Sequence, residues 1–263
     1  MKIGIIGGSG LYSIEGLNFV EDIEINTKFG KPSSVYKHFR KENNDLYFLS
    51  RHGFKHNIAP HKINYRANIS GFKELGVEEI LSFNAVGAIS ENLKPSDIIL
   101  LSNAIDMTWG RVSTFFDENE IVHIDFTNPF CQSMAKNIIN FKDKLSFPLI
   151  IDAVYICTNG PRLETAAEIK MYKMIGADVV GMTLFPEAPL AREAQICYQN
   201  ISIVTNYAAG ISQKKLTTDE VTKTVTAAEA KIREFIVTYC ENVSSNKKCE
   251  CKSALRGSKI SRK

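Results

Sequence analysis

Four polar side chains stand directly after apolar runs, where they could bind an anion. Arg51 and His52 end the stretch "LSRHG", Ser9 lies in the glycine-rich "GIIGGSGLY", and Thr183 follows "ADVVGM". A guanidinium offers a planar fork of N–H donors that suits phosphate, and the N–H groups of a glycine turn can also bind an anion. A plain tight turn explains the glycines equally well. Taken together, the four side chains predict a phosphate site built by the protein alone.

The sequence lacks the motifs of several other chemistries. A dinucleotide motif starting at Gly8 would need glycine at position 13, where Ser13 stands, and no P-loop pattern occurs. Neither the nucleophile elbow G-x-S-x-G nor the zinc motif H-E-x-x-H is present. A nicotinamide oxidoreductase is therefore disfavoured. We expect no cofactor and no catalytic metal, and a reaction that depends on positioning and electrostatics.

The stretch "TNGPRLETAAE" (158–168) places an acid in apolar surroundings. A Gly-Pro turn is followed at once by a predicted helix, with Leu163 and Glu164 in its first turn. An acid there can simply complement the helix dipole, which is worth about 0.3–1 kcal/mol. It can equally bind a ligand. The helical spacing predicts that the apolar stripe of this helix comprises Leu163, Ala166, Ala167, Met171 and Met174.

Short apolar runs alternate with helical patterns along the chain. Continuous Val, Ile and Leu strands separated by helices predict a largely parallel sheet covered on both faces. Ligands in such sheets bind at the carboxyl ends of strands. The predicted strands are 2–6, 21–26, 45–50, 78–83, 97–102, 121–126, 149–156, 177–182 and 201–206, and the predicted helices are 61–76, one after the Gly-Pro turn, 187–197 and 217–239.

The composition predicts one globular, cytoplasmic domain. The chain has 263 residues, of which 44% are hydrophobic, and its apolar runs are much shorter than the roughly 20 residues of a membrane span. The net charge of +3 is misleading, because residues 244–263 carry +6 and leave −3 for residues 1–243. A slightly acidic body argues against a nucleic-acid partner. We therefore expect a domain over 1–243, followed by a basic, flexible tail over 244–263 that contains a Cys-x-Cys pair.

The six cysteines fall into two groups. Four lie in apolar stretches and are expected to be ordinary core residues: Cys131, Cys157, Cys197 and Cys240. Cys249 and Cys251 form a C-x-C pair between lysines, and nearby positive charge lowers the pKa of a thiol. A redox or disulfide role for this pair is one reading. A zinc site would want more ligands at short spacing, and no histidine accompanies the pair.

Seven segments in order resemble the methylthioadenosine phosphorylase and purine nucleoside phosphorylase family. They are "GIIGGSGLY", "RHG", "PHKINYRANI", "NAVGAI", "GPRLETAAE", "GMTLFPEAPLAREA" and "VTNYAAG", and the resemblance runs from about Ile3 to Val237. The resemblance implies a single-domain α/β phosphorylase fold, with a mixed, mostly parallel and partly barrel-like sheet flanked by helices. It also implies homotrimers or homohexamers, and a reaction in which phosphate cleaves a purine nucleoside to free base and ribose 1-phosphate.

The resemblance also assigns roles to particular residues. Phosphate would be held by Ser9, Arg51, His52, Thr183 and the turn at Asn84-Ala85. Met182 would pack beneath the ribose, Leu163 would lie against the base, and Asn206, Tyr207 and Ala208 would line the base site. His123 would reach the 5′ side of the sugar across a subunit boundary.

Departures from the adenine-type relatives favour 6-oxopurines. Those relatives carry two aspartates where this chain has Asn206 and Ala208, and a small hydroxyl residue where it has Glu164. A carboxylate accepts a hydrogen bond from the N1–H of hypoxanthine or guanine, whereas adenine presents a lone pair there. Asn206 can donate to the base and stabilise it as it leaves. Two mismatched polar groups would favour 6-oxopurines by roughly 10²–10⁴-fold.

The 5′ substituent of the substrate is left open by the sequence. Thr218, Val221 and Thr222 are expected near the 5′ side, and their hydroxyl groups favour inosine and guanosine. Methylthioinosine stays an alternative, because the body of the chain is closest to family members that handle methylthio sugars. A non-catalytic nucleoside-binding protein is a further alternative.

Overall fold

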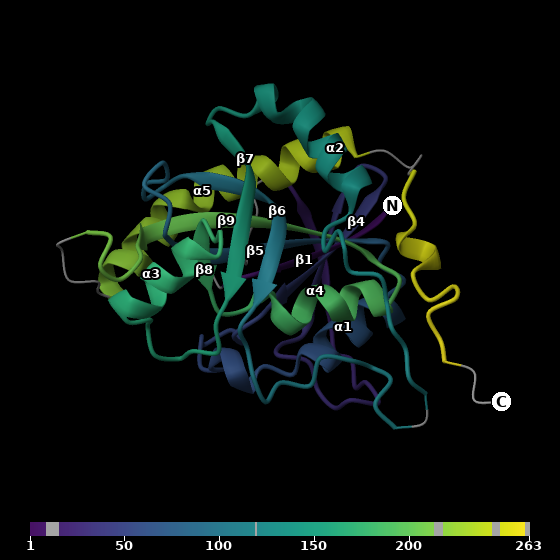
Figure 1. Ribbon diagram of the computed structural model, residues 1–263. Coiled ribbons are helices and arrows are strands. Elements are labelled where there is room, and N and C mark those ends of the chain that lie inside the picture. Colours follow the sequence, from purple (N-terminus) through teal and green to yellow (C-terminus); the bar gives the residue numbers. More distant parts are fainter. Residues whose placement is uncertain (9–15, 119, 213–217, 244–247, 261–263) are drawn as a thin grey trace.

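The architecture is a single sheet flanked by helices, shown in Figure 1 as a computed structural model. The structure describes residues 1–8, 16–118, 120–212, 218–243 and 248–260, without the side chains of residues 218–220. Nine strands join in the order β2-β3-β4-β1-β5-β8-β7-β6-β9, with a further pairing between β5 and β9. Their bounds are β1 Lys2–Gly7, β2 Asn18–Ile23, β3 Tyr36–Lys41, β4 Asn44–Ser50, β5 Glu79–Ala88, β6 Ile98–Asp106, β7 Leu149–Cys157, β8 Val179–Gly181 and β9 Cys197–Tyr207.

The extra pairing between β5 and β9 closes part of the sheet on itself. Strands β5, β8, β7, β6 and β9 follow one another, and β9 then pairs in parallel with β5 over ten residue positions. Closure leaves no free edge in this part of the sheet. The predicted phosphorylase fold, a mixed and partly barrel-like α/β sheet in a single domain, is confirmed.

Strand directions are more mixed than the apolar runs predict. Five pairings are parallel and four antiparallel among the described strands. Strands β6, β7 and β8 run against β1, β4, β5 and β9, because β5 pairs antiparallel with β8 and β6 with β9. The expectation that the candidate residues follow strand ends is therefore wrong for Asn84 and Ala85, which lie inside β5, and the last two residues of β5 pair with β8.

In the described part of the chain five α-helices lie against the sheet, and the two larger clusters of core residues match its two faces. The helices are α1 Tyr65–Glu74, α2 Gln132–Phe141, α3 Ala166–Met174, α4 Leu184–Glu193 and α5 Thr218–Asn242. Neighbouring strand residues alternate between the clusters: Ile6 packs with residues of α1 and α4, whereas Ile5 packs with residues of α2 and α5. Figure 1 shows these helix pairs on opposite sides of the strands. Burial on both faces explains the continuous apolar character of β1.

Three local predictions differ from the structure. Residues 36–41 form β3 and 132–141 form α2, neither of which was predicted, and 121–126 contributes one β-bridge instead of a strand. Helix α3 begins at Ala166 and buries Ile169 and Tyr172. Leu163 therefore precedes the helix, and the predicted apolar stripe is exposed at both of its methionines, Met171 and Met174.

The C-terminal tail packs against the body over residues 248–260. Cys251 is 3% exposed, Lys252 pairs with Glu78 at 3.3 Å, and Lys259 forms a β-bridge with Val122. The expectation of a free, solvated end therefore differs from the structure, because apolar and polar partners on the body are in reach. The division at residue 243 stays a prediction. Within the part of the chain that is described, no helix has the length and apolar character needed to cross a membrane.

Candidate active site

A buried ion pair lies under the candidate site and joins β4 to α4. Arg51 follows the last residue of β4, and Glu187 comes from α4; their side chains are 2% and 0% exposed. Arg51 donates from Nε and Nη2 to the two oxygens of Glu187 at 2.8 and 2.9 Å, and from Nη1 to the Phe83 carbonyl at 2.8 Å. Burial by itself would lower the pKa of Arg51, but Glu187 raises it well above its usual range. The pair therefore stays charged and fixes the loop after β4.

A chain of buried polar side chains runs from this ion pair to Asn84 in β5. Arg51 and Glu187 both bond to the Ser82 hydroxyl, which also accepts from the amide of Asn200 at 3.2 Å. The Ser202 hydroxyl lies 2.9 Å from Asn200 Oδ1 and 2.8 Å from Asn84 Oδ1. Buried polar groups in a low-dielectric interior are generally paired in this way. The Ser202 hydroxyl has one proton, which it can donate to either of the two amide oxygens.

The Asn84 amide nitrogen is a buried donor with no hydrogen-bond partner among the described residues. Asn84 is 8% exposed, and its neighbour Ala85 is the one exposed position of the otherwise buried β5. A buried, unpaired N–H group costs about 1–3 kcal/mol. Such a donor beside an opening in a central strand is suited to an oxygen-bearing ligand.

Thr183 follows β8, the strand that runs antiparallel to the end of β5. Gly87 and Ala88 of β5 pair antiparallel with Val180 and Val179 of β8. Continuing that register past the last paired residues brings Thr183 level with Asn84. Thr183 precedes α4 and its hydroxyl makes no capping bond to the helix. The hydroxyl is thereby left for a ligand.

His52 is a neutral side chain at physiological pH. Burial lowers the pKa of His52 to about 4, and the charge of Arg51 contributes in the same direction. A hydrogen bond with the Ile58 carbonyl raises the pKa, but by less than burial lowers it. Because a carbonyl only accepts, Nδ1 carries the proton and donates to Ile58 at 2.8 Å. Nε2 is then an acceptor. It suits a protonated phosphate oxygen.

Glu164 precedes α3 and takes no part in capping it. Thr165 is the N-cap, and Glu168 supplies the carboxylate of a full capping box. Glu164 turns instead to the end of β7, where the Thr158 hydroxyl donates to its Oε1 at 2.7 Å. Thr158 itself is bound through its backbone N–H to Gly181 at 2.8 Å. The helix-dipole explanation of Glu164 is therefore wrong, because Glu168 has that position.

Asn206 lies beside Gly87 near the end of β9. Its Oδ1 accepts from the Thr205 hydroxyl at 2.7 Å and its Nδ2 donates to the Tyr207 carbonyl at 2.9 Å. A Cβ at Gly87 would stand 3.1 Å from that Nδ2, so the glycine makes room for the amide. Each end of the amide keeps one further hydrogen-bonding position. Since Gly87 pairs with Val180 of β8, the amide lies close to the loops that carry Thr158 and Met182.

Arg111 holds the two loops that frame the site, and sequence reasoning missed it. Its guanidinium donates to the carbonyls of Asn159 at 2.8 Å and Met182 at 2.9 Å, and also to that of Phe185. The same group lies over the ring of Tyr65, 5.6 Å from its centroid. Arg111 thus ties the loop after β7 to the loop after β8. It stands in no motif, and only the close approach of these loops reveals it.

Comparison with known proteins agrees with this geometry. The model of the Phosphorylase superfamily matches residues 2–241. The chain belongs to this phosphorylase superfamily. It is therefore an enzyme of the phosphorylase class, which transfers pentosyl groups.

Relatives and a solved structure cover nearly the whole phosphorylase chain. A protein of Thermodesulfovibrio yellowstonii, named a probable S-methyl-5′-thioinosine phosphorylase, is 47% identical over 97% of this chain and 96% of its own. The 6-oxopurine nucleoside phosphorylase of Pyrococcus furiosus is 43% identical, over 97% and 98%. The crystal structure of a methylthioadenosine phosphorylase from an antarctic soil metagenomic library is 34% identical, with a TM-score of 0.92 over 98% of this chain and 92% of that one.

The phosphorylase fold brings most of the predicted residues to one region, with three exceptions. Ser9 and the side chain of Thr218 lie outside the described residues. Gly7, the last residue of β1, accepts from the Arg51 N–H at 3.1 Å. His123 is exposed and its backbone pairs with Ser258 in the tail. Among the described residues, none of its hydrogen bonds reaches the other candidates.

The remaining predicted residues differ in burial. Leu163 is 47% exposed and Tyr207 is 36% exposed, whereas Ala208 is 4% exposed and donates its N–H to Ala88 at 2.8 Å. Met182 packs against Gly160, where any side chain would collide with its sulfur. The roles assigned to these residues stay predictions. Glu187 is the second important residue missed, although "GMTLFPEA" contains it.

Proposed function

We propose that the protein is a purine nucleoside phosphorylase that cleaves 6-oxopurine nucleosides, inosine and guanosine, to free base and ribose 1-phosphate. The observation that carries the proposal is the placement of Glu164. Its carboxylate is half-buried, is released from helix capping by Glu168, and is held through one oxygen by Thr158. Among the described residues no hydrogen bond uses the other oxygen, which can therefore accept from a substrate. No cofactor is needed, because inorganic phosphate is the co-substrate.

Discrimination between purines follows from the hydrogen on N1. A 6-oxopurine donates N1–H to Glu164, whereas adenine would set a lone pair against the carboxylate. One such mismatch costs about 1–3 kcal/mol. Asn206 supplies the second contact, because its amide keeps one donor and one acceptor position after its bonds with Thr205 and Tyr207. A donor there stabilises the purine as negative charge builds on it.

The phosphate would lie between β5 and the loop after β8. In this proposal Asn84 Nδ2 and the Thr183 hydroxyl donate to the phosphate, and His52 Nε2 accepts from a protonated phosphate oxygen. Arg51 uses four of its five N–H groups on Glu187, Ser82 and Phe83, so it offers one more at most. An oxygen of phosphate attacks the anomeric carbon while the bond to the base breaks. The phosphate charge stabilises the positive charge that develops on the sugar.

S-methyl-5′-thioinosine is the second candidate substrate, and the names of two relatives support it. The 47% identical protein of Thermodesulfovibrio yellowstonii carries that name, as does a 44% identical protein of Methanocaldococcus jannaschii. The 43% identical relative of Pyrococcus furiosus supports the riboside instead. Both candidates share the 6-oxopurine base. They therefore share the contact with Glu164 and differ only at the 5′ position.

We also propose that the enzyme works in the cytoplasm as a homotrimer or homohexamer. Large apolar side chains stand exposed on the single chain, including Trp109 at 76% and Met174 at 79%. Exposed apolar patches mark association surfaces, and an exposed His123 could serve a neighbouring subunit. Light scattering after size exclusion measures the assembly.

Phosphate-dependent release of purine from a substrate panel tests the proposal. Inosine, guanosine and adenosine, each with its methylthio counterpart, are assayed with the wild type and the E164S/N206D double variant. We expect 6-oxopurines to be favoured by roughly 10²–10⁴-fold in the wild type. The double variant should move that preference towards 6-aminopurines.

The matched control is Glu168→Gln, which removes the capping carboxylate on the same segment. Its thermal stability should fall, by about 1 kcal/mol of helix-cap energy, while the purine preference stays unchanged. A double variant that still favours inosine over adenosine by the original ratio would show that the base site is assigned wrongly. If phosphate released no purine from any of the nucleosides, the protein would be a non-catalytic nucleoside-binding protein instead.

A further inference from the structure

Four of the six cysteines converge on one point at the opposite end of β9 from Asn206. The sulfur atoms of Cys131, Cys197, Cys249 and Cys251 all lie within 4.8 Å of one another. Three of these residues are buried, at 2%, 0% and 3% exposure, and Cys249 is partly exposed. All four thiols are free. Cys131 and Cys197 are buried in the core, as expected, and they also take part in this cluster.

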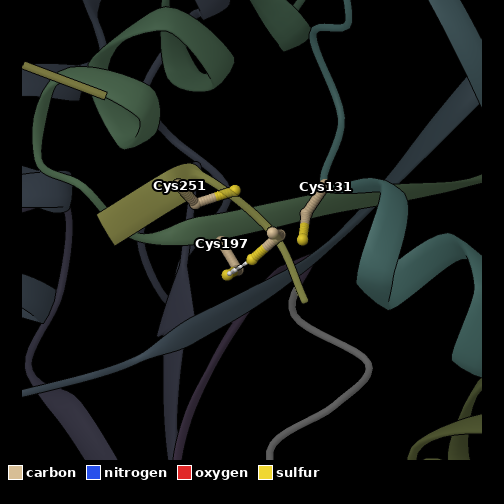
Figure 2. A group of neighbouring side chains, drawn as sticks. Cys131, Cys197 and Cys251 are labelled. Carbon is tan, nitrogen blue, oxygen red and sulfur yellow. Dashed lines mark hydrogen bonds between the residues drawn. The ribbon is translucent and has the colours of Figure 1, made fainter. Parts of the chain in front are cut away.

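The ligands come from three segments that are far apart in the sequence. Cys131 is the N-cap of α2, Cys197 is the first residue of β9, and the C-x-C pair lies at the start of the last short helix, Cys251–Ser253. Figure 2 shows Cys131, Cys197 and Cys251 pointing towards one another from these elements. Backbone bonds fix the first two, from Cys131 N–H to Tyr198 at 2.8 Å and from Cys197 N–H to Glu78 at 3.1 Å. The site is therefore prepared by the body and completed by the tail.

The sulfur spacing matches tetrahedral metal coordination. A zinc–sulfur bond of about 2.3 Å places the four sulfurs of a tetrahedron about 3.8 Å apart. Cys197 and Cys249 approach to 3.5 Å, and the whole set fits inside 4.8 Å. Two separate disulfides would require two pairs, each bonded at about 2.05 Å, with no need for all four sulfurs to converge. Four thiolates without a histidine suit Zn²⁺ among the biological cations.

The surroundings of the cluster favour thiolates. Cys131 stands at the N-terminus of a ten-residue helix, where the helix dipole stabilises negative charge. Lys248 and Lys252 flank the C-x-C pair, and Lys252 is held on the body by Glu78. A Zn²⁺ ion with four thiolates carries a net charge of −2, which these cations offset.

We propose that the four cysteines bind one structural Zn²⁺ ion that clips the C-terminal tail to the body. Binding releases the protons of the thiols, up to four per ion, and changes no oxidation state. All four coordination positions are occupied by protein, so the ion has no open position for catalysis. The clip fixes the start of β9 and the tail. In the tail, the Ser258 carbonyl accepts from the His123 N–H, and Lys259 forms a β-bridge with Val122.

Metal content and thiol counts of the full chain test the proposal. The protein is produced in a reducing cytosol with zinc in the medium and purified without chelator. We expect about one zinc per chain by elemental analysis, and six titratable thiols after denaturation without reductant, the number in the sequence. Replacement by Co²⁺ should give the visible bands of tetrahedral thiolate coordination.

A pair of variants separates the cluster from cysteine content in general. C249S/C251S removes two ligands and should lose the zinc, with a Tm lower by roughly 5 °C. Cys240→Ala removes a buried cysteine outside the cluster and should keep about one zinc per chain. Equal zinc content in both variants would overturn the proposal. So would two or four missing thiols in the denatured wild type, because disulfides would then occupy the sulfurs.

Discussion

The phosphate side and the base side of the candidate site are held in different ways. On the phosphate side, Arg51, Glu187 and Ser82 are buried and joined by a continuous polar network that ends at Asn84. On the base side, Glu164 is half-buried and held by one hydroxyl, and Leu163 is 47% exposed. One side is therefore part of the core, and the other is a loop placed over it.

This difference teaches which part of the site can change without loss of the fold. A buried charge that loses its partner destabilises the whole domain, so the phosphate side is constrained by folding as well as by binding. A half-exposed carboxylate before a helix is free of that constraint. Preference for the base can therefore change by substitution at position 164, whereas phosphate binding is built into the core.

The largest expected effect is a difference in the free energy of unfolding when the same Glu→Gln substitution is made on each side of the site. Glu187→Gln leaves the buried Arg51 charge uncompensated and should lower the free energy of unfolding by about 3–5 kcal/mol. Glu164→Gln keeps an oxygen for Thr158 and should change it by less than about 0.5 kcal/mol. Denaturant unfolding of both variants beside the wild type measures the difference. Equal losses would show that the two sides are not held differently.

A smaller effect is expected where the network meets the ligand. Asn84→Asp keeps the acceptor for Ser202 and replaces the unpaired donor with an oxygen that repels phosphate. We expect kcat/KM for phosphate to fall by about 10- to 100-fold, with the chain still folded. Asn92→Asp, on an exposed turn, is the matched control and should leave kcat/KM unchanged. Unchanged phosphate kinetics in Asn84→Asp would remove this side chain from the phosphate site.

The last effect is expected from His52 and depends on pH. The pKa of His52 in the folded chain is lowered to about 4 from an ordinary value of 6.5. The unfolded chain therefore takes up the proton first as pH falls. The stability that neutral His52 provides is complete above pH 6.5 and is lost as pH falls from 6.5 towards 4.

Unfolding of the wild type and His52→Asn between pH 4 and pH 7 measures this term. The difference between their unfolding free energies should change by up to about 1.4 kcal/mol per pH unit below the ordinary pKa, and should be constant above it. A constant difference over the whole range would show that His52 titrates normally. His52 would then be less buried than the other residues of the phosphate side.

The sequence predicted the strands with continuous apolar runs and missed the elements without them. β1, β4, β7 and β9 were found within a few residues, because burial on both faces leaves an uninterrupted Val, Ile and Leu signal. β3, with the sequence YKHFRK, lies near the sheet edge and keeps polar residues. In "IVHIDF" the alternation that predicts a strand is present, yet the described segment forms one β-bridge, between Val122 and Lys259 of the tail. The pattern cannot show whether a partner exists.

Prediction of the site depended on motif residues and failed for residues that act by long-range contact. Arg51, His52 and Glu164 were singled out because their types and positions suit chemistry. Arg111 and Glu187 were missed, because an arginine in a loop and an acid in a helix are ordinary until the fold brings carbonyls or a buried guanidinium to them. The zinc-site argument failed in the same way, since Cys131 and Cys197 lie more than fifty residues from the C-x-C pair.

The sequence by itself determined the superfamily, the alternation of strands and helices, and the residue types that are proposed to meet the purine. These depend on the local order of residues and on side-chain chemistry, both of which can be read directly from the sequence. Only the tertiary structure decided that β5 meets β8 in opposite directions, that Asn84 is left with a free donor, and that four cysteines converge. Such facts depend on contacts between distant segments. Each contact is set by the closure of the whole sheet, which no single segment encodes.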